Sequence, residues 1–213
     1  MDSEISGWES IYRSTSTYDR ATPHEDAGNL HRLFVENEVN RILDLGCGDG
    51  RHLHYYGNLG YKMFGLDYAP SALHLADKWL ASDNLSAELV CADMTGMPWR
   101  DELFDAVISF LVINHNPVER IRRTIEEIHR VLKSGGWLFI AVSTCKPLGP
   151  VRYCSGIEIE PDTIVLTEGR EKGVPHHFFT TSELIEMFSR FTLVDFHWDS
   201  RSRACLLLRK CIS

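Results

Sequence analysis

The chain has 213 residues, of which 44% are hydrophobic and 24% are charged. These values are ordinary for a globular protein and argue against fibrous repeats or disorder, and the length suits one domain. The formal net charge of -8 disfavours nucleic acid as a partner, because phosphate binding needs clustered Lys and Arg. We therefore expect a single domain over residues 1–213 that is soluble and cytoplasmic, with no membrane span.

The six cysteines are scattered without a C-x-x-C pair, and residues 1–5 lack the basic-then-apolar order of a secretory signal. Reduced thiols are therefore expected rather than disulfides. A zinc site could be imagined from Cys145, Cys154, His176 and His177, but their spacing matches no familiar zinc motif. We expect no metal centre.

Residues 1–40 precede the first predicted strand and are expected to form a helical cap, with an aromatic, polar lead at its start. After them, short apolar runs alternate with amphipathic segments, which is the pattern of βαβ units in a parallel sheet. The predicted elements in this part are a helix at 24–37, a strand at 41–45, a helix at 50–59, a strand at 61–67, a helix at 70–81, and strands at 87–92 and 104–110.

The clearest helix follows the strand at 104–110. Asn116 can cap it, Pro117 opens it, and Gly135-Gly136 are expected to stop it. Its core stripe consists of Ile121, Ile125, Ile128 and Leu132. A strand at 137–143 is predicted to come next.

Residues 145–179 depart from this alternation of strands and helices, because Pro and Gly interrupt the sequence; a hairpin is possible around Glu160-Pro161-Asp162. A segment of that length is usually functional, so we interpret it as a substrate-side insertion. A helix at 181–189 with a Thr or Ser cap is predicted to follow, and strands at 191–198 and 204–210 would form a terminal antiparallel pair.

The first candidate for chemistry is a glycine-rich turn between the first strand and the first crossover helix. Gly46, Gly48 and Gly50 permit positive φ and let a ligand approach the backbone closely. The helix N-terminus beyond them offers free N–H groups to an anionic ligand group. Asp44 would repel a pyrophosphate, but it could bond to the ammonium of a methionine moiety.

Two further carboxylates follow the next two strands. Asp67 lies about twenty residues after the glycine turn, where an acid can accept hydrogen bonds from ribose hydroxyls. Asp93 could accept from the exocyclic amine of an adenine. Open α/β sheets bind ligands at the carboxyl ends of their strands, so these residues predict a nucleoside ligand. The D-x-G-x-G-x-G pattern departs from the dinucleotide fingerprint, which favours S-adenosylmethionine over NAD.

These residues resemble the class I S-adenosylmethionine-dependent methyltransferases, particularly the small type 11 group. The resemblance is specific over residues 41–143 and rests on the motifs DLGCGDG (44–50), GLD (65–67), ADM (92–94), FDAVIS (104–109) and LKSGG (132–136). It implies an α/β, Rossmann-like sheet of seven mostly parallel strands in the order 3-2-1-4-5-7-6, with strand seven antiparallel and helices on both faces. It also implies S-adenosyl-L-methionine as cofactor and S-adenosyl-L-homocysteine as product.

Carried over by position, the resemblance implies that the two glycines of the turn hold the methionine part, that Asp67 binds the ribose, and that Asp93 lies near the adenine. An aromatic lead would close over the cofactor. The full set of implied cofactor contacts is Trp8, Tyr12, Asp44, Gly46, Cys47, Gly48, Asp67, Tyr68, Asp93, Met94, Phe110 and Leu111.

Three histidines are candidates on the acceptor side. His115 follows the fourth strand, where a histidine could orient or deprotonate an acceptor, and we predict that it is catalytic. The alternative is a residue of a helix-capping loop. His176 and His177 could line the substrate pocket, and their alternative is a packed loop.

Methyl transfer from a sulfonium is an in-line displacement on an activated donor, so the protein chiefly aligns the reactants and excludes water. We expect a small-molecule acceptor. One alternative is a tRNA-modifying methyltransferase, which the stretch at residues 112–115 faintly resembles. Another is a noncatalytic nucleotide-binding module or an NAD-dependent oxidoreductase with the same fold. The sequence identifies neither the acceptor nor the oligomeric state.

Overall fold

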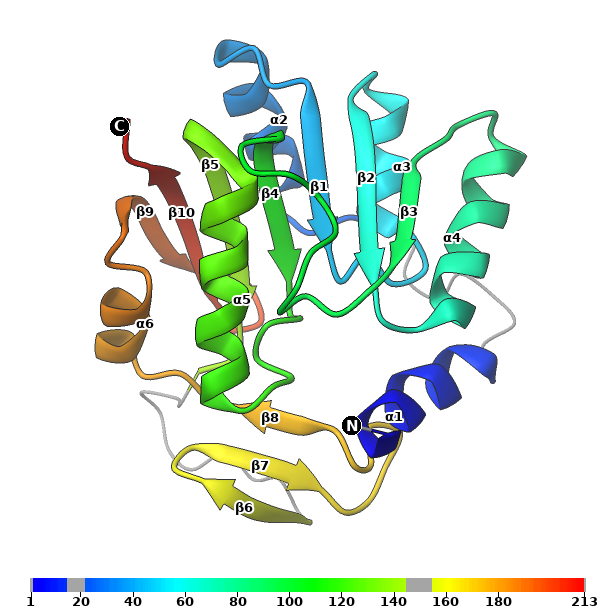
Figure 1. Ribbon diagram of the computed structural model, residues 1–213, viewed down its shortest axis with the longest axis vertical. Helices are drawn as coiled ribbons and strands as arrows, with labels where there is room; N and C mark the ends of the chain where they lie inside the picture. Colours follow the sequence, from blue (N-terminus) through cyan, green and yellow to red (C-terminus); the bar gives the residue numbers. More distant parts are fainter. Residues whose placement is uncertain (1, 15–21, 145–154, 213) are drawn as a thin grey trace.

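The structure is a computed structural model that describes residues 2–14, 22–144 and 155–212. Its centre is a seven-stranded sheet in the order β3-β2-β1-β4-β5-β10-β9 (Figure 1). The strands are β1 (Arg41–Leu45), β2 (Lys62–Asp67), β3 (Glu88–Cys91), β4 (Phe104–Phe110), β5 (Leu132–Val142), β9 (Phe191–Trp198) and β10 (Ala204–Lys210). Strand β10 runs antiparallel to both of its neighbours. The predicted order and the antiparallel strand are therefore confirmed.

Helices cover both faces of this sheet because alternate strand residues carry apolar side chains to each side. The helices are α1 (Asp2–Arg13), α2 (Ala27–Glu36), α3 (Arg51–Asn58), α4 (Pro70–Ser82), α5 (Val118–Val131) and α6 (Thr181–Met187). One buried cluster joins the sheet to α5 and α6, and a second joins its other face to α2, α3 and α4. Among the described helices, none is long and apolar enough to cross a bilayer.

The helix after β4 differs from the prediction at both ends. It ends at Val131 rather than at Gly135-Gly136, because β5 already begins at Leu132, which pairs with Phe104. Hydrophobic periodicity predicted Leu132 to lie in the helix, but its pairing with β4 makes it the first residue of a strand. At its start Asn116 makes no cap; Glu160 accepts from the N–H of Val118 at 2.7 Å instead.

The predicted hairpin in residues 145–179 is present within the described part of that segment. Strands β6 (Gly156–Glu160) and β7 (Thr163–Leu166) are antiparallel, and β8 (Pro175–His177), which the sequence did not predict, adds a third strand. In Figure 1, this small sheet and α1 lie at the edge toward which β1, β2 and β4 point. That edge is where the carboxyl ends of the parallel strands meet.

Candidate functional site

The glycine turn after β1 is held against the end of β2. The N–H groups of Gly46 and Cys47 donate to the carbonyl of Leu66 at 2.7 and 3.0 Å. Gly46 and Gly48 both have positive φ, and a Cβ at Gly48 would lie 2.5 Å from the hydroxyl of Tyr12. Only glycine fits this turn without displacing its neighbours. The turn therefore forms a backbone cradle in front of α3.

Cys47 contributes to this cradle through its backbone. Its side chain is buried in the cluster beneath α3, where a Cβ added at Gly65 would lie 2.9 Å from its sulfur. Burial raises the pKa of the Cys47 thiol well above its usual value. The thiol therefore belongs to the core, and only the main chain of Cys47 lines the turn.

Asp67 closes the cradle from the end of β2. One carboxylate oxygen accepts from the N–H of Gly48 at 2.8 Å, and the other accepts from the N–H of Ala69 at 2.9 Å. Burial raises the pKa of Asp67, and these N–H groups oppose the rise. Each carboxylate oxygen can accept a second hydrogen bond, so the group can hold the turn and still receive a donor from a ligand.

Asp44 lies one strand away, with 2% of its surface exposed. Among the described residues, its Oδ2 atom has no hydrogen-bond partner. Burial raises its pKa to about 7; the nearby Arg51 opposes the rise and the Asp67 carboxylate adds to it. A buried carboxylate oxygen without a donor is costly, so the site is incomplete without a cationic or N–H group at this point.

Asp93 follows β3 and is already engaged by the protein. It accepts from Arg120 at 2.8 Å and from the N–H and hydroxyl of Thr95 at 2.9 and 2.7 Å. Burial favours a higher pKa for Asp93, but these bonds outweigh it and lower the pKa. Arg120 also donates to Asn116, whose amide lies 3.7 Å from the sulfur of Met94. Arg120 is not among the residues predicted from the sequence; its position in the first turn of α5, at the carboxyl edge of the sheet, was the available signal.

The aromatic lead reaches the same edge. Trp8 in α1 lies 6.5 Å from Tyr12 and 4.9 Å from His115, ring centre to ring centre. Helix α1 is attached to α4 because Glu9 accepts from the backbone N–H and the hydroxyl of Ser71 at 3.0 and 2.6 Å. The structure thus brings Trp8 and Tyr12 beside the cradle, and Glu9, which no sequence motif indicated, anchors their helix.

The two residues at the end of β4 have different surroundings. The Phe110 ring is 8% exposed and stacks on His52 at 3.8 Å, within the cluster under α3. Leu111 has φ of +60°, a strained value for a leucine, and its N–H donates to Ala141 at 2.8 Å. Such strain is typical of functional sites. Tyr68, after β2, is half-buried.

The acceptor-side histidines separate into two groups. His115 and His176 lie 4.6 Å apart with their rings perpendicular. Burial lowers the pKa of His115 to about 3, helped by His176, and lowers that of His176 to about 4, so both are neutral at pH 7. His177 instead lies 2.8 Å from Thr163 and 3.1 Å from Glu183, which ties β8 to α6. The two cysteines of the zinc site considered from the sequence, Cys145 and Cys154, lie outside the described residues.

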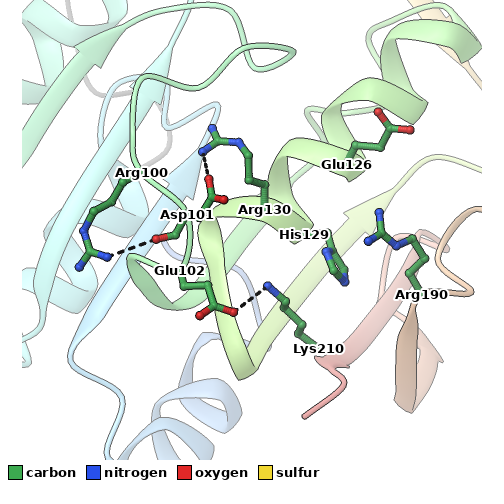
Figure 2. Close-up of a pocket in the computed structure, with 8 residues that line it drawn as sticks. All are labelled: Arg100, Asp101, Glu102, Glu126, His129, Arg130, Arg190 and Lys210. Atoms are coloured by element: carbon green, nitrogen blue, oxygen red, sulfur yellow. Dashed lines mark hydrogen bonds and ion pairs between the residues drawn. The ribbon is translucent and has the colours of Figure 1, made fainter. Parts of the chain in front are cut away.

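A charged hollow of about 500 Å³ opens at the opposite edge of the sheet (Figure 2). Lys210 is 3.4 Å from Glu102, and Arg130 is 2.9 Å from Asp101. Glu102 precedes the first residue of β4, so this hollow lies at the amino ends of the parallel strands. It is therefore separate from the cradle and from the carboxylates around it.

Comparisons with known proteins agree with this geometry. A family model described as a methyltransferase domain (Methyltransf_11) matches residues 43–140. A probable tRNA methyltransferase 9B of Homo sapiens is 32% identical over 134 residues, which is 62% of this chain and 28% of that protein. A demethylmenaquinone methyltransferase of Clavibacter sepedonicus is 34% identical over 146 residues, 65% of this chain and 58% of that protein. The chain thus spans less than two thirds of either relative.

A solved structure from Methanosarcina mazei, described as a SAM-dependent methyltransferase, has the same fold with a TM-score of 0.72. It is 23% identical and covers 84% of this chain and 98% of that one. Similarity at this level of identity establishes the fold of the sheet and its helices.

Proposed function

We propose that this chain transfers a methyl group from S-adenosylmethionine to a small-molecule acceptor, since residues 43–140 match the methyltransferase-domain model. The cofactor of this family is S-adenosyl-L-methionine. The observation that carries the proposal is the pairing of the glycine cradle with the buried, unsatisfied oxygen of Asp44. An amino-acid ammonium supplies the positive N–H donors that this oxygen needs.

The residues present fit the rest of that cofactor. The N–H groups at the start of α3 suit its carboxylate, and the free lone pairs of Asp67 suit its ribose hydroxyls. Asp93 and Met94 would face the adenine, and Tyr68 would flank it. Phe110 and Leu111 would border the methionine side, and Trp8 and Tyr12 would cover it. When bound, the sulfonium supplies an already activated methyl group.

What the protein adds is alignment and exclusion of water. Trp8 and Tyr12 shield the cradle from solvent, and their π faces favour a cation. His115 orients the acceptor through a neutral imidazole, since a group whose pKa is about 3 is a weak base at neutral pH. This favours acceptors that lose a proton without help from a strong base. Residues 145–179 and the cap at residues 1–40 would select the acceptor.

A tRNA acceptor is the second candidate, and the human relative named a probable tRNA methyltransferase favours it. The net charge of -8 weighs against it, because a tRNA surface repels an acidic protein. The small-molecule acceptor and the predicted cytoplasmic location remain proposals.

The test is calorimetric titration of the purified chain with S-adenosylmethionine, S-adenosylhomocysteine and NAD in parallel. We expect micromolar binding of the first two and none of NAD; binding of NAD alone would overturn the proposal. Turnover is then measured with thiol, amine and hydroxyl acceptors and with tRNA. Salt-sensitive binding and methylation of tRNA would replace the small-molecule acceptor with the second candidate.

A further inference from the structure

Three side chains at the acceptor edge converge on one point. His115 comes from the loop after β4, Glu171 from the loop between β7 and β8, and His176 from β8. One ligand atom from each lies within 4.8 Å of the other two. Nε2 of His176 and Oε2 of Glu171 are already 3.2 Å apart. Three chain segments thus bring two imidazoles and one carboxylate together.

We propose that His115, Glu171 and His176 bind a divalent transition-metal ion, with zinc as the best match. Two histidines and one glutamate are a known zinc donor set that leaves a fourth position open. Ligand atoms in a tetrahedral zinc site lie about 3.4 Å apart. The Glu171–His176 pair meets this spacing, and the ligand atom of His115 lies within 4.8 Å of both partners.

The surroundings favour a metal ion. The two imidazoles and the carboxylate are donor types that zinc prefers, and they come together from three separate segments. Within the described chain, Nδ1 of His115 is buried without a hydrogen-bond partner, a costly arrangement that a metal bond or its supporting contact would relieve. Glu171 supplies the negative charge, and its side chain is 34% exposed, which gives an ion a path from solvent.

A second group of possible ligands is less suitable. His24, Asp199 and Cys205 form one triad, and Asp26 and His197 with the same cysteine form another. These groups already satisfy one another: His24 lies 3.1 Å from Asp199, and His197 lies 3.1 Å from Asp26. An ion there would have to break these bonds, so this network provides a natural comparison site.

The position of the ion suggests its use, and this step rests on the proposed function. The Trp8 ring lies 4.9 Å from His115 and also neighbours Tyr12 over the cradle. The open metal position therefore lies on the acceptor side. A hydroxyl or thiol bound there would have a lowered pKa, and its proton would pass to solvent. This would activate the acceptor next to the cradle.

The experiment uses the untagged full chain, freed of metal with a chelator. Zinc binding is measured by calorimetry, cobalt binding by visible absorption, and metal content by mass spectrometry. We expect one ion per chain and a tetrahedral cobalt spectrum without a thiolate charge-transfer band. Glu171→Gln and His176→Asn should each weaken binding at least about tenfold. The exposed Glu168→Gln and the comparison-site variant Cys205→Ser should bind as the wild type does.

Absence of saturable zinc binding would overturn the proposal. Equal affinity in wild type and Glu171→Gln, or loss of binding in Cys205→Ser alone, would also overturn it. S-adenosylhomocysteine binding by the metal-free wild type and by Glu171→Gln is measured separately. Failure of the wild type to bind it contradicts the proposed function and leaves the metal site standing, so the two failures are distinguishable.

Discussion

At the scale of single residues, the carboxylates of Asp44 and Asp67 differ in the hydrogen bonds that they accept. Asp67 receives two backbone N–H groups, whereas Oδ2 of Asp44 receives none from the residues that the structure describes. Both lie in the region that the sequence marked by its glycines and strand ends. That the two differ in hydrogen bonding could not be predicted, because it depends on how the turn folds back onto β2.

Asp44 leads to a prediction about pH. Its pKa of about 7 means that it is largely protonated below neutrality in the free protein, and a bound ammonium favours the ionised form. The affinity for S-adenosylhomocysteine should therefore rise with pH, approaching about tenfold per unit below pH 7. Calorimetry between pH 5.5 and 7.5 measures this rise. Asp44→Asn should bind weakly with a flat profile; an equally steep profile in that variant would refute the assignment.

Asp67→Asn tests the ribose contact. The amide cannot accept at both ends, so the variant loses one bond to the turn and weakens the site for a hydroxyl donor. We expect S-adenosylhomocysteine binding to weaken by about 1 to 3 kcal/mol. Asp101→Asn, at the opposite edge of the sheet, is the matched control. Unchanged affinity in Asp67→Asn would remove this residue from the proposed contacts.

At the scale of elements, the site depends on how α1 lies over the glycine turn. Glu9 attaches α1 to the start of α4, and the Tyr12 hydroxyl occupies the space where a Gly48 side chain would be. The aromatic residues of this helix were predicted as cofactor contacts. Its anchoring could not be predicted, because Glu9 and Ser71 are far apart in the sequence.

Comparing Gly48→Ala with Gly60→Ala should separate the cost of backbone strain from the effect of a clash with Tyr12. Gly48 and Gly60 both have positive φ, but only Gly48 has a neighbour within 4 Å of a new Cβ. Each alanine should cost about 1 to 2 kcal/mol of unfolding free energy. Only Gly48→Ala should also weaken S-adenosylhomocysteine binding, by at least about fivefold, or about 1 kcal/mol. Adding Tyr12→Phe removes the clashing hydroxyl and should recover S-adenosylhomocysteine binding, measured by calorimetry. Equal binding by both alanine variants would contradict this role.

At the scale of the whole molecule, the buried His52 and the half-buried His197 make stability depend on pH. Burial lowers the pKa of His52 well below its usual value, and its Nε2 accepts from the N–H of His24 at 3.2 Å. His197 has the opposite shift: burial opposes protonation, but Asp195 and Asp26 outweigh it and raise the pKa. The contribution of His52 to the unfolding free energy is therefore fully present above about pH 6.5 and falls at lower pH. The contribution of His197 is present at low pH and is lost as pH rises through its raised pKa.

For His52, the unfolded chain takes up a proton that the folded chain excludes. The unfolding free energy should therefore fall below pH 6.5, by up to about 1.4 kcal/mol per pH unit from this group. In urea titrations between pH 6.5 and 5, His52→Gln should reduce that slope by about this amount. The exposed His74→Gln, which removes a histidine outside the core, is the matched control. A slope insensitive to His52→Gln would show that this histidine is protonated in the folded protein.

The strand order was implied by the resemblance of the motifs to a known family, whereas the sequence by itself determined the alternation of strands and helices, the hairpin near residue 161 and the glycine turn. These features follow from local rules: strand and helix periodicity, and the need for glycine at positive φ. Only the tertiary structure decided that Glu160 caps α5, that Arg120 holds Asp93, and that Glu171 meets two histidines. Those contacts join segments distant along the chain, and their partners are set by packing rather than by any local pattern.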